Sequence, residues 1–286
     1  MTSTGGIEVV ARLRAAGCVF AEEEAALLAE AAEVTGADLD ELVSRRVSGT
    51  PVEHLLGWAE FHGIRVGVTS GVFVPRQRTG FLVDEAALAV RALGVRRPVV
   101  LDLCCGSGAL GLALATALAD ERISVELVAA DIEPAAVACA RRNLAAWDAS
   151  VYEGDLFEPL PADLRGRIDI LLCNTPYVPT GMIARMPPEA RDHEPRRALD
   201  GGADGLDILR RVAAAAPVWL APGGHLLVEE SEAQAPVAAD ILRAHGLDAH
   251  IRSSEEYEEY EEYEATAVIA RKPGRPTSTR GPVASR

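Results

Sequence analysis

The Asn-Thr-Pro-Tyr segment at residues 174–177 holds the residue types best suited to orient a reacting nitrogen. An apolar run at 168–173 precedes it and predicts a buried strand, and ligands of parallel α/β sheets bind beyond the carboxyl ends of strands. The Asn174 oxygen can accept one N–H of an amine or amide, and a following carbonyl can accept another. The alternative is an asparagine that only satisfies a turn. The candidate catalytic residues are Asn174, Thr175, Pro176 and Tyr177.

A glycine-containing turn at residues 104–108 follows a second apolar run, at 99–103, and precedes a helical pattern that begins near Ala109. Small residues in this position let the backbone approach a ligand closely and aim the helix N-terminus at it. Cys104 stands where the dinucleotide fingerprint has its first glycine, which disfavours a pyrophosphate. A nucleotide-like ligand is expected, with a tight turn that binds nothing as the alternative. The candidate contacts are Asp102, Cys104, Cys105, Gly106, Ser107 and Gly108, and Asn174 is counted as a cofactor contact as well as a catalytic residue.

An acidic residue, Asp131, ends the next expected strand, at 125–131. It lies on the order of 20 residues beyond the glycine turn, where a carboxylate can accept both ribose hydroxyls. The neighbouring Ile132 is counted as a further contact. Glu133 is the rival acid, although it directly precedes Pro134, which opens the next helix.

The third expected strand, at 150–153, leads into Asp155, whose carboxylate can accept a hydrogen bond from an adenine amino group. Leu156 and Phe157 are expected to line the base pocket. The alternative role for Asp155 is to cap a turn.

Strand-like and helical runs alternate from residue 99 onward, which predicts an α/β class with a mainly parallel sheet in a three-layer sandwich. The last two strands are close enough in sequence to be an antiparallel pair. Seven strands are expected, at 99–103, 125–131, 150–153, 168–173, 225–229, 248–252 and 265–270.

Before the sheet, the pattern predicts a small bundle of amphipathic helices at 8–16, 22–34 and 38–47. Near-alternating apolar residues then predict a linking hairpin within 61–74, with a turn at 69–71. The expected boundaries are 1–57 for the helical domain, 58–75 for the hairpin, 76–272 for the catalytic domain and 273–286 for a disordered tail.

The net charge and the composition of the chain disfavour several classes of function. The chain has 286 residues, 49% of them hydrophobic, and a net charge of −15, which makes direct nucleic-acid binding unfavourable because phosphate contacts need cations. Seven glutamates in the repeat at 255–264 predict a solvated loop, with docking of a basic partner as the alternative. No run reaches the roughly 18 apolar residues of a membrane span, and the start lacks a secretory signal, so the expected location is cytoplasmic.

Neither the five cysteines nor the histidines have metal-ligand spacing, so no metal site is expected. The cysteines are interpreted as reduced thiols. His54, His62 and His193 are interpreted as structural or surface residues.

Taken together, these motifs resemble the HemK/PrmC-type protein-(glutamine-N5) methyltransferases, which methylate the glutamine of the Gly-Gly-Gln motif in peptide-chain release factors. The similarity runs from about residue 13 to residue 270, and the order and spacing of many segments make it specific. The segments that carry it are 48–57, 73–76, 101–108, 131–134, 174–177, 194–202 and 204–207.

This resemblance implies a Rossmann-like class I fold with S-adenosylmethionine as cofactor and S-adenosylhomocysteine as product. It also implies transfer of a methyl group to a glutamine amide held by Asn174 and the Thr175 carbonyl, through orientation rather than a strong base. A release factor or similar protein would be the partner. The N-terminal helices either dock this substrate or merely cover one edge of the catalytic domain.

The sequence departs from the family pattern in two places. Thr175 replaces the first proline of Asn-Pro-Pro-Tyr, which reduces the stiffness of the loop. Residues 77–80 read Gln-Arg-Thr-Gly instead of Pro-Glu-Thr-Glu, so Arg78 and Gly80 remove two carboxylates near the cofactor entrance. These changes leave open methylation of a nucleobase nitrogen, methylation of a small molecule, and a non-catalytic cofactor-binding module.

Overall fold

The computed structural model of the chain describes residues 3–256 and 264–274. Its centre is a seven-stranded sheet with the order β5-β4-β3-β6-β7-β9-β8, in which only β9 runs antiparallel to its neighbours. This confirms the predicted α/β class and the predicted antiparallel pair at the end of the chain. The strands are β3 (Val99–Leu103), β4 (Glu126–Asp131), β5 (Ala149–Glu153), β6 (Ile168–Cys173), β7 (Leu220–Glu230), β8 (Asp248–Ser253) and β9 (Thr266–Arg271).

The strand order reverses between β3 and β6, which lie side by side with Leu103 paired to Cys173. Such a switch point opens a crevice beyond the carboxyl ends of the strands. The glycine turn after β3 and the Asn-Thr-Pro-Tyr segment after β6 therefore meet at one place.

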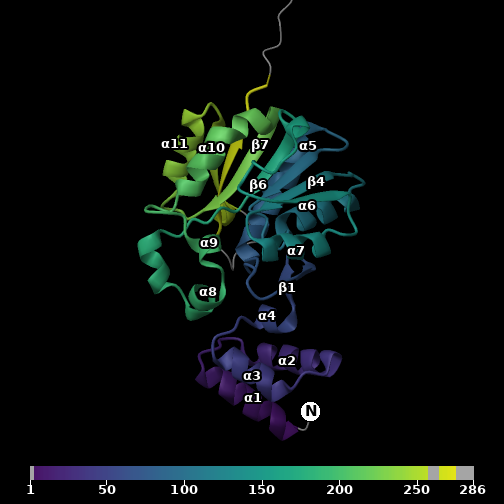
Figure 1. Cartoon of the computed structure of the whole chain (residues 1–286), viewed down its shortest axis with the longest axis vertical. Helices are drawn as coiled ribbons and strands as arrows, with labels where there is room; N and C mark the ends of the chain where they lie inside the picture. Colours follow the sequence, from purple (N-terminus) through teal and green to yellow (C-terminus); the bar gives the residue numbers. More distant parts are fainter. Residues whose placement is uncertain (1–2, 257–263, 275–286) are drawn as a thin grey trace, which may run out of the picture.

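Helices cover both faces of the sheet, which gives the three predicted layers (Figure 1). Every side chain of β3 is buried, as expected for a central strand covered on both sides. One apolar cluster joins the sheet to α10 and α11, and a second joins it to α5, α6 and α7. These helices are α5 (Gly80–Leu93), α6 (Ala109–Asp120), α7 (Pro134–Asn143), α10 (Asp207–Trp219) and α11 (Ala235–Ala244).

The N-terminal helices form a separate bundle at one end of the long axis (Figure 1). The three predicted helices are present, and the structure adds a short fourth one, α4, which ends at Gly57 in a left-handed conformation. The four are α1 (Ser3–Ala15), α2 (Ala21–Thr35), α3 (Leu39–Val47) and α4 (Val52–Leu56).

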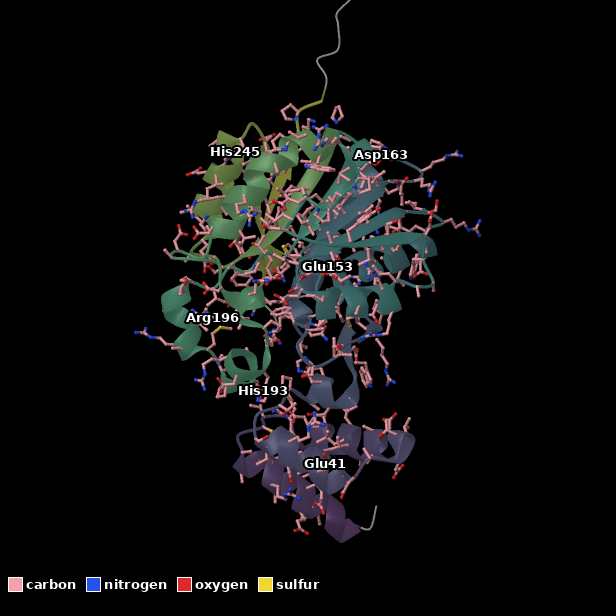
Figure 2. All side chains as sticks on the ribbon, in the orientation of Figure 1. Glu41, Glu153, Asp163, His193, Arg196 and His245 are labelled. Atoms are coloured by element: carbon pink, nitrogen blue, oxygen red, sulfur yellow. The ribbon has the colours of Figure 1, made fainter. Side chains whose placement is uncertain are left out.

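A buried cation ties this bundle to the catalytic domain. Arg46 of α3 donates to both carboxylate oxygens of Glu24, at 2.6 and 3.0 Å, and to Glu189 of α8 (Pro188–His193) at 2.6 Å. At the end of the same short helix, His193 faces the N-terminal helices and lies against Gly49 (Figure 2). One guanidinium therefore neutralises carboxylates from two parts of the molecule.

Replacement of Arg46 by alanine is expected to lower the free energy of unfolding by about 3 kcal/mol, because it leaves the nearly buried Glu24 carboxylate unpaired. Urea unfolding followed by circular dichroism measures this loss. Arg12→Ala is the matched control, since its ion pair with Asp40 is exposed and its removal is expected to change little. Equal losses in the two variants would show that Arg46 does not join the domains.

The predicted hairpin exists, but its turn was placed wrongly. It consists of β1 (Trp58–Phe61) and β2 (Ile64–Gly67), so its turn falls at His62 and Gly63. The predicted turn at 69–71 is also present, closed by a hydrogen bond from the Val72 N–H to the Thr69 carbonyl at 3.0 Å, but it follows the hairpin. Both turn residues have positive φ, 49° and 72°, the backbone of a tight two-residue hairpin turn. A glycine after histidine is a weak signal for this turn, which is why Thr69-Ser70-Gly71 looked more favourable.

Two predictions lie outside the described residues, namely most of the acidic tyrosine repeat and nearly all of the C-terminal tail. Within the described ranges, no helix combines the length and the apolar character that crossing a membrane requires.

Candidate active site

A cavity of about 340 Å³ opens at the carboxyl ends of β3, β4, β5 and β6. Volumes of this size suit small-molecule and cofactor sites. Of the residues predicted to form the site, Asp102, Gly108 and Phe157 are absent from the cavity wall. Those in the wall are Cys104, Cys105, Gly106, Ser107, Asp131, Ile132, Asp155, Leu156, Asn174, Thr175, Pro176 and Tyr177.

The glycine turn runs along the cavity in a left-handed backbone conformation. Cys104 has φ 57° and Gly106 has φ 53°, and the Gly106 N–H donates to Asp131 at 2.8 Å. Gly108 caps the start of α6 with φ 77°, and a Cβ there would come within 3.3 Å of Ala140 and Leu144. Gly108 therefore serves the close packing of α6 on α7 and not the cavity.

Asp102 joins β3 to α6, the helix that follows the turn. It is fully buried in the middle of β3, where one carboxylate oxygen accepts the Gly111 N–H at 2.8 Å. The other oxygen has no partner among the described residues. Burial raises the pKa of Asp102 to about 8, so this carboxyl holds a proton at neutral pH.

Asp131 ends β4 at the cavity, as the sequence predicts for a ribose contact. Its two oxygens accept backbone N–H groups from Gly106 and Glu133, at 2.8 and 2.9 Å, which fixes the carboxylate in one orientation. Burial raises its pKa. The rival Glu133 also lies in the cavity wall, where its carboxylate forms an ion pair with Arg197 at 3.1 Å.

The region expected to receive an adenine is formed only in part as predicted. Asp155 and Leu156 lie in the cavity wall, with Asp155 in an ion pair with Arg211 at 2.8 Å. Phe157 does not line the cavity, and that prediction was wrong. Its ring stacks on Trp219 of α10 with centroids 5.5 Å apart, because it completes the apolar core on that face of the sheet.

Asn174 follows β6 directly and lies half-buried in the cavity wall. Its carboxamide makes no hydrogen bond to any described side chain or backbone group. The next residue, Thr175, is buried, and its hydroxyl has no partner among the described residues either. Buried and half-buried amides normally find partners, so the free Asn174 carboxamide is suited to a ligand.

Tyr177 is held at its hydroxyl by two side chains. Arg78 donates to the Tyr177 oxygen at 2.6 Å, and the tyrosine hydroxyl donates to Glu229 at 3.1 Å. Burial, followed by the Glu229 charge, raises the pKa of Tyr177 to about 12. Tyr177 therefore stays protonated and acts as a donor, not as a base.

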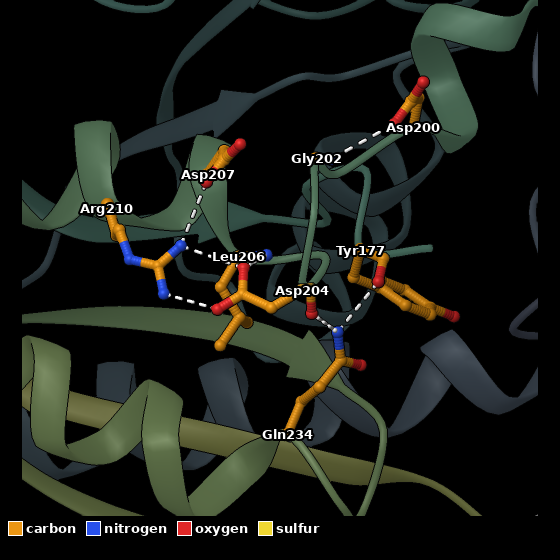
Figure 3. Close-up of polar contacts among 8 residues, drawn as sticks. All are labelled: Tyr177, Asp200, Gly202, Asp204, Leu206, Asp207, Arg210 and Gln234. Carbon is orange, nitrogen blue, oxygen red and sulfur yellow. Dashed lines mark hydrogen bonds and ion pairs between the residues drawn. The ribbon is translucent and has the colours of Figure 1, made fainter. Parts of the chain in front are cut away.

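A glycine-rich strap at residues 199–207 lies against the backbone of the same loop. The Gln234 side chain donates to the Tyr177 carbonyl at 2.9 Å and to the Asp204 carbonyl at 3.0 Å (Figure 3). A Cβ at Gly205 would lie 2.1 Å from the Tyr177 carbonyl oxygen, so only glycine fits. The strap and the loop thus form one packed unit.

Reasoning from the sequence missed three side chains that shape this site: Glu229, Gln234 and Asn143. Glu229 is the penultimate residue of β7, and a polar residue near a strand end beside the loop was a usable signal. Asn143 bonds to the backbone of Gly67 and Ser107 and so joins the hairpin to the glycine turn. No local pattern marks Asn143 or Gln234, because each acts across a long sequence separation.

A second buried acid, Glu230, makes folding stability depend on pH. Both of its oxygens lack partners among the described residues, and burial, followed by the Glu229 and Asp204 charges, raises its pKa from 4.5 to about 8. Between these values the folded state retains a proton that the unfolded state has lost. Its stabilising contribution is therefore complete below pH 4.5 and is lost as the pH rises to about 8.

Glu230→Gln is expected to reduce the loss of unfolding free energy between pH 5 and pH 8 by about 3 kcal/mol, because the neutral amide cannot ionise. Urea unfolding at the two pH values measures this difference. The exposed Glu232→Gln variant is the control, and it should behave as the wild type does. An unchanged pH dependence in Glu230→Gln would contradict the assignment.

The sheet order, the glycine turn at the switch point and the acid at the end of β4 define a class I S-adenosylmethionine-dependent methyltransferase. The Methyltransferase small domain family matches residues 69–186. In fold, the chain is similar to a T. thermophilus 16S rRNA N2 G1207 methyltransferase solved with S-adenosylmethionine and guanosine. The TM-score is 0.50 and the identity is 23%, over 75% of this chain and 49% of that one.

Two curated relatives are closer in sequence. A release factor glutamine methyltransferase from Streptomyces coelicolor is 39% identical over 75% of this chain and 78% of its own length. A 4-amino-L-phenylalanine/4-methylamino-L-phenylalanine methyltransferase from Streptomyces pristinaespiralis is 33% identical over 79% and 81%. The chain belongs to the release factor glutamine methyltransferase family, which confirms the resemblance found in its motifs.

Proposed function

We propose that this enzyme transfers a methyl group from S-adenosylmethionine to the side-chain amide nitrogen of a glutamine in a peptide-chain release factor. The observation that carries the proposal is the Asn174 carboxamide, which lies free in the cavity wall beside the fixed ring of Tyr177. The Streptomyces coelicolor relative, a release factor glutamine methyltransferase, supports the same acceptor.

The residues present fit the cofactor. Asp131 would accept the ribose hydroxyls, the glycine turn would approach the ligand through its backbone, and Ile132 and Leu156 would contact the base. When bound, the cofactor supplies a methyl group on a positively charged sulfur. Asp102 and Gly108 contribute through the shape of the turn and not through contact.

An amide nitrogen is a poor nucleophile because its lone pair is delocalised. Two acceptors, the Asn174 oxygen and the Thr175 carbonyl, would hold its N–H bonds and direct the nitrogen at the methyl group, while Tyr177 packs over the amide plane. Orientation in a water-poor site supplies most of the rate in such a displacement. The protonated Tyr177 hydroxyl rules this side chain out as a strong base at neutral pH.

The N-terminal bundle would dock the protein substrate. Arg46 attaches the bundle to Glu189 of α8. In the segment that follows α8, Arg197 and Leu199 lie in the cavity wall. A release factor acts during translation, so we place the reaction in the cytoplasm.

The direct test incubates the enzyme and S-adenosylmethionine with a purified release factor from the same source. A mass increase of one methyl group on the glutamine of its Gly-Gly-Gln motif is expected, and none on a variant with asparagine at that position. A release factor left unmodified by an enzyme that binds the cofactor would overturn the proposed acceptor.

A second candidate acceptor is an aromatic amine on a free amino acid, because the Streptomyces pristinaespiralis relative is a 4-amino-L-phenylalanine/4-methylamino-L-phenylalanine methyltransferase and matches over a similar share of the chain. Running the same assay with 4-amino-L-phenylalanine in place of the release factor separates the two. Methylation of the amino acid alone would move the enzyme to this second function.

A further inference from the structure

Three side chains from distant parts of the chain meet at the phenol of Tyr177. Arg78 lies in the 3-10 turn η1 (Gln77–Thr79) before α5, and Glu229 lies at the end of β7. The Arg78 Nε donates to Glu229 Oε1 at 3.1 Å, Nη2 donates to the Tyr177 oxygen at 2.6 Å, and the phenol donates to the same Oε1 at 3.1 Å. These contacts close a ring, which we name the Arg78–Tyr177–Glu229 clamp.

Within the clamp, the buried Glu229 carboxylate is paired with the Arg78 guanidinium. Glu229 is 4% exposed, and Arg78 is the cation that forms an ion pair with it among the described residues. The flat guanidinium presents its donors in a fixed fork, so it serves the carboxylate and the phenol at the same time. Arg78 also lies in the cavity wall, on the side where Tyr177 faces the ligand space.

The clamp fixes the Tyr177 side chain, which the backbone contacts of the loop leave unfixed. Thr175 leaves its φ angle free where a proline would lock it, and its hydroxyl makes no hydrogen bond to a described residue. Gln234 fixes the Tyr177 carbonyl, but a bond at the carbonyl does not set the side-chain rotamer. The orientation of the ring therefore depends on contacts at its hydroxyl.

We infer that Arg78 and Glu229 are positioning residues, which act through the Tyr177 hydroxyl to hold its ring against the acceptor. The inference rests on the proposed function, in which the ring packs over the acceptor amide. It assigns a role to Arg78, which stands at one of the two places where this chain departs from its family pattern.

The test is a double-variant cycle of Arg78→Ala and Tyr177→Phe, with release factor methylation as the readout. Each single variant is expected to lower kcat by roughly 10- to 100-fold, with the affinity for S-adenosylmethionine within about threefold of wild type. The double variant should be no more than about twofold slower than either single variant, because both remove the same contact. Arg78→Lys should recover little kcat, because an ammonium lacks the fork.

Arg91→Ala is the matched control, since its guanidinium is equally exposed and pairs with Glu121 far from the cavity. Its kcat should equal that of wild type. Independent, multiplying losses in the double variant, or an unchanged kcat in Arg78→Ala, would overturn the clamp. Wild type without turnover would instead count against the proposed function.

A measurement that needs no acceptor separates a failure of the clamp from a failure of the proposed function. In protein labelled with 3-fluorotyrosine, the ¹⁹F signal that disappears in Tyr177→Phe belongs to Tyr177. Arg78→Ala and Glu229→Gln should each move this signal toward the position of a free tyrosine and narrow it. A signal that stays in place in both variants would overturn the clamp, whatever the acceptor.

Discussion

Replacing Asn174 with alanine is expected to lower the turnover number on a release factor by roughly 100- to 1,000-fold, the range seen when one positioned polar group is removed from a reacting centre. The affinity for S-adenosylmethionine should stay within about threefold, because the turn and Asp131 are untouched. The reason is that the Asn174 carboxamide makes no hydrogen bond to a described residue. Its removal breaks no contact of the fold and removes only an acceptor from the cavity wall.

Single-turnover kinetics with saturating cofactor, together with calorimetric cofactor titration, measure the two quantities. Asn143→Ala is an informative comparison, since this carboxamide bonds to the backbone of Gly67 and Ser107. It should lower the melting temperature, whereas Asn174→Ala should leave it unchanged. An Asn174→Ala enzyme that turns over normally would remove Asn174 from the reaction.

Replacing Gly205 with alanine is expected to lower turnover by at least roughly 100-fold, because displacement of reacting groups by about 1 Å has effects of that size. The new Cβ would lie 2.1 Å from the Tyr177 carbonyl oxygen and 2.3 Å from the Gln234 amide nitrogen. The strap and the loop cannot both keep their present positions, so the strap must move away from the loop. Positive φ at Gly205, 85°, adds about 1–3 kcal/mol of backbone strain.

Gly246→Ala separates the two effects. Gly246 has nearly the same φ, 82°, but a Cβ there meets nothing within 4 Å. Gly246→Ala should lose only the stability that the positive φ costs and keep its turnover, whereas Gly205→Ala should lose more stability in thermal unfolding and also lose turnover. If the two variants turn over equally well, the strap does not set the position of the Asn-Thr-Pro-Tyr loop.

Most of the sheet could be predicted from the sequence, because its central strands are buried on both faces and read as continuous apolar runs. The predicted strands at 99–103 and 168–173 match β3 and β6 to the residue. β7 starts five residues earlier than predicted, at Leu220. Its first residues include Pro222, Gly223 and Gly224, which are typical of turns, and the register with β6 shifts there, from Leu220 opposite Ile168 to His225 opposite Ile170.

The candidate site could be located from the sequence, but its side-chain contacts could not. Strand ends and turns follow from local pattern, so the cavity wall was predicted in large part. The clamp depends on tertiary folding, since Arg78 lies 99 residues from Tyr177 and 151 from Glu229. Phe157 shows the same limit, because an aromatic residue after a strand suits a base pocket and a core equally well.

The central claim is that the acceptor is a protein glutamine held by Asn174. The most direct measurement incubates methyl-labelled S-adenosylmethionine with a proteome extract from the same source and locates the label by mass spectrometry, with wild type and Asn174→Ala in parallel. The account predicts label on a release factor glutamine with the wild type and none with the variant. Label on RNA or on a small molecule, with no labelled protein, would contradict it.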